Sequence, residues 1–168
     1  MGKLTVQTKI QLGLIGILGI FALSLIFSQS SSPNIPPLFA LKRIQEKVFL
    51  KLKSNPEQRL DYMTFLLNNR LDEMRNLVNS QSYNYILPTS LRYSTLAGQI
   101  TDLIIGNNLK DKVSSTEQKF TDHQKVLNDL YVIYPKNIPD NEEWKYIQDD
   151  YNYLKLYLDK LTNYAKEK

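Results

Sequence analysis

Beyond residue 37, apolar side chains recur at every third or fourth position, the spacing that gathers them on one face of an α-helix. Such a face must be covered by other helices, because one helix alone cannot shield it from water. The pattern therefore predicts an all-α fold. Its clearest instance, near the C-terminus, comprises Trp144, Ile147, Tyr151, Leu154, Leu158, Leu161 and Ala165.

Turn residues divide this pattern into segments. Helices are expected at about residues 38–53 and 56–78, where Asn55 suits a helix cap and Pro56 a first helical position. A third helix is expected from about Thr89. The remaining expected stripes are Leu41, Ile44, Val48 and Leu52; Leu60, Met63, Leu67, Leu71, Met74 and Val78; Leu96, Ile100, Leu103 and Ile104; and Leu109, Val113, Thr116, Phe120, His123, Leu127, Leu130 and Tyr134.

The number of helices depends on residues 106–108, Gly-Asn-Asn, which either end a helix or lie within one very long helix. Prolines at 135 and 139 end the fourth stripe, after which Asp140 or Asn141 can cap the last helix. We therefore expect an antiparallel bundle of four to five helices.

Residues 10–27 carry no charge and are predicted to form a transmembrane helix. Eighteen helical residues span about 27 Å, close to the thickness of the hydrocarbon core of a bilayer. Lys3 and Lys9 precede this segment, and the next basic residue is Lys42. Because positive residues flank the cytoplasmic side, the N-terminus is expected in the cytoplasm and the rest outside it. The alternative is a signal peptide cleaved near residues 28–30.

The expected organisation is thus a single-pass protein of the cell membrane. A cytoplasmic stub comprises residues 1–9, and the transmembrane helix, or signal, comprises residues 10–27. Residues 28–37, rich in serine and proline, form a stalk, and residues 38–168 form an extracytoplasmic helical-bundle domain. The oligomeric state is left open.

The composition of the chain excludes several kinds of chemistry. The chain has no cysteine, one histidine and a net charge of +4 with mixed signs, so thiolate chemistry is excluded and nucleic-acid binding is not expected. His123 lies on an apolar stripe and is expected to be a hydrogen-bonded core residue rather than a ligand. The acidic pairs at 142–143 and 149–150 are interpreted as capping and solvated surface. No catalytic residues, metal or cofactor are predicted.

A second aromatic face of the last helix is the candidate partner-binding site. Tyr146, Tyr153, Tyr157 and Tyr164 lie off its main stripe. Either another helix of the bundle covers these rings, or they stay partly exposed and bind a partner.

Three motifs suggest a family. The run PLFALKRIQE at residues 37–46, followed by Asn55-Pro56-Glu57 and Arg70-Leu71-Asp72-Glu73, resembles an uncharacterised bacterial family of membrane-anchored extracytoplasmic helical domains. Residues 92–99 and 144–148 are similar to longer members. The resemblance implies a membrane-tethered helical domain and supplies no catalytic residues.

These observations predict a non-enzymatic envelope protein that binds or scaffolds other proteins through its helical surface. The alternative is a small ligand-sensing bundle that works with a separate membrane partner. A pocket lined by His123, Thr116 and tyrosines would favour this alternative.

Overall fold

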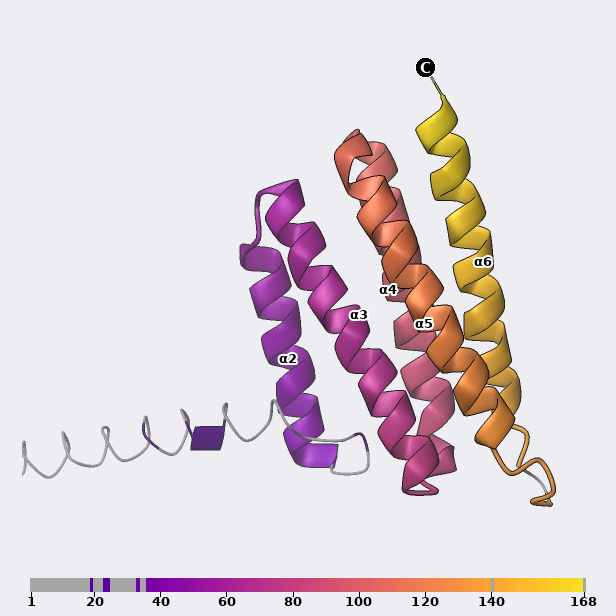
Figure 1. Ribbon diagram of the computed structural model, residues 1–168. Coiled ribbons are helices and arrows are strands. Elements are labelled where there is room, and N and C mark those ends of the chain that lie inside the picture. Colours follow the sequence, from indigo (N-terminus) through magenta and orange to yellow (C-terminus); the bar gives the residue numbers. More distant parts are fainter. Residues whose placement is uncertain (1–18, 20–22, 25–32, 34–35, 140, 168) are drawn as a thin grey trace, which may run out of the picture. The chain divides into compact units, whose positions relative to one another are not determined.

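The computed structural model describes residues 19, 23–24, 33, 36–139 and 141–167 (Figure 1). The chain divides into two compact units, residues 1–49 and 50–168. Within the described residues, the regular structure consists of α-helices and two short 3₁₀-helices, with no strand, which confirms the all-α fold. No helix in this part of the chain is long and apolar enough to cross a bilayer. The predicted span, residues 10–27, lies outside the described residues except for Gly19, Leu23 and Ser24.

Helix α2 (Pro36–Leu52) begins two residues before the expected start. Two prolines fit there because the first turn of a helix needs no backbone donors. The predicted apolar stripe is largely not covered, since the exposed fractions of Ile44, Val48 and Leu52 are 60%, 50% and 70%. The expectation that every apolar stripe is buried is therefore wrong for α2.

Helix α3 (Pro56–Asn79) begins as predicted, with the Asn55 side chain accepting a 2.8 Å hydrogen bond from the Glu57 N–H. Helix α4 (Ile86–Gly106) begins earlier than the expected Thr89, directly after the 3₁₀-helix η1 (Tyr83–Tyr85). Pro88 lies in its first turn rather than before it, which explains the shifted boundary.

A real break separates α4 from α5 (Val113–Ile133), so the single very long helix is excluded. Asn108 adopts a φ of 55°, and the Leu109 N–H then donates to the carbonyl oxygen of Ile104 at 3.0 Å. A residue in this left-handed region terminates a helix and satisfies its last carbonyls. The 3₁₀-helix η2 (Lys110–Lys112) completes the turn.

Helix α6 (Trp144–Lys166) follows the proline-containing linker. The Asn141 side chain accepts hydrogen bonds from the Tyr134 hydroxyl and, at 3.4 Å, from the Glu143 N–H. The N-cap position of α6 is however Glu143, without a side-chain capping bond, so the prediction that Asn141 caps this helix is wrong. Asp140, the other candidate cap, lies outside the described residues.

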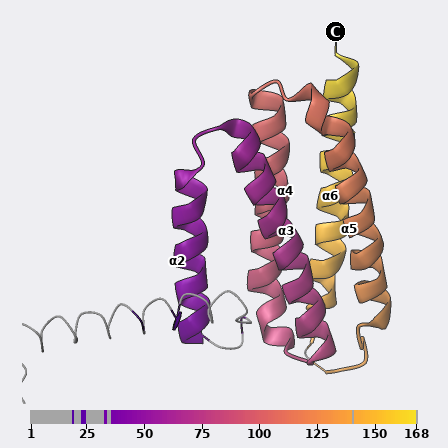
Figure 2. The ribbon, with the colours of Figure 1, turned by 60° about the vertical axis from the view of Figure 1, so that its left-hand side comes forward.

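In the second unit, α3 packs along α4, α4 along α6, and α6 along α5, whereas α3 and α5 meet in fewer places. Consequently α3 and α6 occupy opposite corners of a four-helix bundle (Figures 1 and 2). The stripes predicted for α3 to α6 face its interior. Their buried members are Leu60, Met63, Leu67, Leu71, Met74, Val78, Leu96, Ile100, Ile104, Val113, Thr116, Phe120, His123, Leu127, Leu130, Tyr134, Ile147, Leu154 and Leu161.

Candidate functional site

The outer flank of α6 carries the exposed part of the predicted aromatic face. Tyr153 is 47% exposed and Leu156 is 48% exposed, although both are large apolar or amphipathic side chains. The Tyr153 ring stacks on the ring of Tyr157, with centroids 6.3 Å apart and planes inclined by 18°. This stacking restricts the Tyr153 side chain, so that less conformational entropy is lost if a partner covers it.

Tyr157 belongs partly to the bundle. Its hydroxyl lies so close to Gly98 of α4 that a Cβ atom there would stand 2.8 Å from the hydroxyl oxygen. Burial is the largest cause of a raised Tyr157 pKa. Tyr157 therefore joins α6 to α4 and at the same time supports the ring of Tyr153.

The other two tyrosines are also held by the bundle. The Tyr164 hydroxyl donates a 2.7 Å hydrogen bond to the Asn108 side chain in the α4–α5 turn. Tyr146 is half-buried against the core, and its carbonyl oxygen accepts a 3.2 Å hydrogen bond from Ser90. The four predicted residues thus separate into one exposed ring, Tyr153, and three that also pack against the core.

His123 lies inside the bundle and is 5% exposed. Its Nε2 is 2.9 Å from the Asn68 side-chain oxygen, and its Nδ1 is 3.0 Å from the Tyr93 hydroxyl. Burial, assisted by the Lys119 charge, lowers its pKa to about 4. The ring is then neutral at pH 7. Since an amide oxygen only accepts, Nε2 carries the proton and Nδ1 accepts from Tyr93. This confirms the predicted hydrogen-bonded core histidine.

Asp150 corrects the interpretation of the acidic pairs as solvated surface. Asp149 is exposed, but Asp150 is 1% exposed and faces the interior. Burial raises its pKa to about 8, opposed in part by the nearby hydroxyls of Ser90 and Ser94. Those hydroxyls donate to main-chain carbonyl oxygens, and within the described residues neither Asp150 carboxyl oxygen has a hydrogen-bond partner. Adjacent helical residues point about 100° apart, so a charged pair need not share one environment.

Sequence reasoning also missed a buried ionic cluster between α3 and α4. Arg70 Nη1 lies 2.5 Å from Glu73 Oε1, and Arg92 Nη2 lies 3.7 Å from Glu73 Oε2. The side chains of Arg70 and Glu73 are 4% and 7% exposed. The only signal was that Arg70 and Glu73 stand three apart among apolar residues, a spacing at which helical side chains meet.

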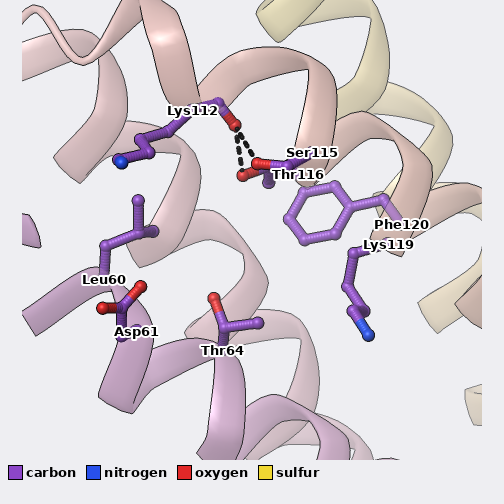
Figure 3. Close-up of a pocket in the computed structure, with 8 residues that line it drawn as sticks. All are labelled: Leu60, Asp61, Thr64, Lys112, Ser115, Thr116, Lys119 and Phe120. Carbon is purple, nitrogen blue, oxygen red and sulfur yellow. Dashed lines mark hydrogen bonds between the residues drawn. The ribbon is translucent and has the colours of Figure 1, made fainter.

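A hollow of about 230 Å³ lies between α3 and the N-terminal part of α5 (Figure 3). Its polar lining includes hydroxyls of Ser115 and Thr116, both of which donate to the Lys112 carbonyl oxygen, at 3.0 and 2.8 Å. Its lining residues are Leu60, Asp61, Thr64, Lys112, Ser115, Thr116, Lys119 and Phe120. Of the residues expected for the ligand-sensing alternative, Thr116 lines this hollow, whereas His123 and the tyrosines do not. No group of three or more potential metal ligands occurs in the described parts of the chain.

The comparison with family models decides the affiliation of the chain. Residues 32–137, more than half of it, match the domain of unknown function DUF5667. The chain belongs to this family. Comparisons with curated proteins and with solved structures give no significant match.

The DUF5667 match includes α2 to α5 and ends before α6. It contains the buried ionic cluster and the hydrogen-bonded Asn68, His123 and Tyr93. Asp150 and the candidate tyrosines lie on α6, beyond the matched residues. The comparison thus confirms an uncharacterised family, and the residues that it includes hold α3, α4 and α5 together.

Proposed function

We propose that this DUF5667 protein is a non-enzymatic protein-binding module of the cell envelope, and that it captures its partner through the outer flank of α6. The observation that carries the proposal is the exposure of Tyr153 and Leu156, 47% and 48%, on an otherwise well-packed helix. Aromatic residues that are held rigidly and left accessible are the usual anchors of protein interfaces.

The surroundings of these two residues also suit a protein partner. Asp149 precedes Tyr153 by one helical turn, and Lys160 follows Leu156 by one turn, both exposed. Lys160 Nζ is 5.7 Å from the centroid of the Tyr157 ring. An apolar centre with charges of both signs at its rim is the common composition of a protein interface.

Residues 10–27 provide the proposed tether, and the lysines before them set the proposed orientation, with the bundle outside the cytoplasm. The uncharged run and the lysines before it support this location.

The test is chemical crosslinking in intact cells, followed by identification of the proteins captured by the full chain. The double variant Tyr153→Ser, Leu156→Ser is expected to lose a specific crosslinked species while its melting temperature stays close to that of the parent. The matched control is Lys125→Ser on α5, where the side chain is 68% exposed. Equal capture by the parent and the double variant would refute the assignment to α6.

A further inference from the structure

A second exposed surface, on α2, is not used by the proposed function. Ile44, Val48 and Leu52 follow one another at intervals of four residues and therefore form a continuous stripe on one side of the helix. Their exposed fractions are 60%, 50% and 70%. Leaving three branched apolar side chains in water, in line, is unfavourable unless another surface covers them.

A basic stripe lies beside this apolar one. Arg43, Lys47 and Lys51 are also spaced by four residues and are all exposed. Each apolar residue of the stripe stands one position after a basic one, so the two stripes are neighbours along the whole helix. Glu46 is the only acidic residue of α2. The exposed side of α2 therefore combines apolar contact with a row of positive charges.

We propose that this face of α2 lies on a membrane surface that contains anionic lipid. The apolar stripe would enter the boundary between headgroups and acyl chains, while the guanidinium and ammonium groups would bind lipid phosphates, as in other basic amphipathic helices. The chemistry favours lipid over a protein partner because the stripe of Arg43, Lys47 and Lys51 is positive along its whole length and suits an extended negative surface.

The place of α2 in the chain agrees with this partner. The proposal rests on the tether of the proposed function in one respect, since residues 28–35 are then all that separates the membrane-inserted segment from α2. Eight extended residues reach at most about 28 Å, so α2 would begin close to the bilayer. Contact with the surface would then be favoured by a high effective concentration.

The experiment uses the full chain in vesicles. Because the chain has no cysteine, Val48→Cys introduces a single site for an environment-sensitive fluorophore. The probes are vesicles of phosphatidylcholine alone and of phosphatidylcholine mixed with phosphatidylglycerol, each carrying a lipid-attached quencher. The matched control is the same label on Lys125→Cys of α5, whose side chain is 68% exposed. Circular dichroism checks that both labelled chains keep the helical content of the parent.

We expect strong lipid quenching of the Val48 label in the anionic vesicles, several-fold less in the neutral ones, and little quenching at Lys125 in either. The triple variant Arg43→Gln, Lys47→Gln, Lys51→Gln should reduce the quenching at Val48 in anionic vesicles toward the neutral value. Raising the salt concentration should have the same effect, because contacts with charged headgroups are screened.

Three outcomes would overturn the proposal. In the first, the Val48 label stays as accessible to water as the Lys125 label in anionic vesicles. In the second, quenching does not depend on lipid charge or on the three basic residues. In the third, the Val48 label is shielded from water equally in both kinds of vesicle without lipid quenching, which would show that protein covers the face. Equal partner capture by the parent and the α6 double variant, or release of the chain from vesicles by a salt wash, would instead count against the proposed function.

Discussion

Tyr93 on α4 and His123 on α5 are joined by a 3.0 Å hydrogen bond between the tyrosine hydroxyl and Nδ1, and their rings stack with centroids 5.9 Å apart. Asn68 on α3 completes the arrangement by accepting from Nε2 at 2.9 Å. One imidazole thus connects three helices, including α3 and α5, which otherwise meet in few places.

The first prediction concerns this connection. Tyr93→Phe keeps the ring but removes the donor to Nδ1, leaving a buried acceptor without a partner. We expect a loss of about 1–3 kcal/mol in the free energy of unfolding, measured by urea denaturation. Tyr153→Phe removes an exposed hydroxyl and should change the free energy of unfolding by less than about 0.5 kcal/mol. Equal effects of the two substitutions would contradict the role given to the hydrogen bond.

The second prediction concerns pH. The folded pKa of His123, about 4, lies below its ordinary 6.5, so the stability that this residue contributes is present above pH 6.5 and is lost as the pH falls toward 4. The folded pKa of Asp150, about 8, lies above its ordinary 3.8, so stability is lost as the pH rises from 3.8 toward 8. Between pH 4 and 6.5 the two groups change the free energy of unfolding in opposite directions as the pH rises, so their effects oppose each other.

The free energy of unfolding should therefore vary little from pH 4 to 6.5 and then fall by about 1.4 kcal/mol per unit between pH 6.5 and 8. Denaturant titrations across this pH range measure the free energy of unfolding. Asp150→Asn should remove the fall above pH 6.5, whereas Asp149→Asn, at an exposed position, should leave it in place. A profile that is the same in both variants would show that Asp150 is not the titrating group.

The third prediction concerns the ionic cluster. Glu73→Ala leaves the Arg70 guanidinium buried without its carboxylate at 2.5 Å, and should cost about 3–5 kcal/mol. The control is the exposed pair one turn away, in which Arg75 Nη1 lies 2.8 Å from Asp72 Oδ1. Asp72→Ala should cost less than about 1 kcal/mol because water solvates both charges. Thermal unfolding followed by circular dichroism distinguishes the two.

The fourth prediction concerns the approach of α4 to α6. In Gly98→Ala the new methyl group would stand 2.8 Å from the Tyr157 hydroxyl oxygen, so Tyr157 must shift. Despite the better helix propensity of alanine, we expect a net loss of about 1 kcal/mol. At Gly106 no atom lies within 4 Å of the added Cβ, and Gly106→Ala should not destabilise the protein. A stabilised Gly98→Ala protein would contradict the close packing.

The sequence predicts much of the bundle because burial of apolar stripes dominates helix packing. The eight residues of the predicted stripe between Leu109 and Tyr134 were expected on one face, and all of them but Leu109 are buried. Local periodicity does not show which apolar stripe will be covered by another helix. The spacing of Ile44, Val48 and Leu52 is as regular as that of Leu60, Met63 and Leu67, yet only the latter three are buried.

The candidate site could be predicted only in part for the same reason. Tyr153 and Tyr157 are four apart on one helix, and only the nearness of Gly98, about sixty residues away in sequence, makes Tyr157 a packing residue. The burial of Asp150 likewise depends on α4 lying against α6. The interior position of Asp150 results from packing between helices, and the charge pattern along one helix does not predict it.

Site-specific photo-crosslinking in intact cells tests the central claim most directly. A photoreactive amino acid is placed at Tyr153 on α6 or at Lys125 on α5, in the full chain, and the crosslinked products are identified. The account predicts a distinct protein adduct from position 153 that is absent from position 125 and that weakens when Leu156 is changed to Ser. No adduct from position 153, or the same adducts from both positions, would contradict it.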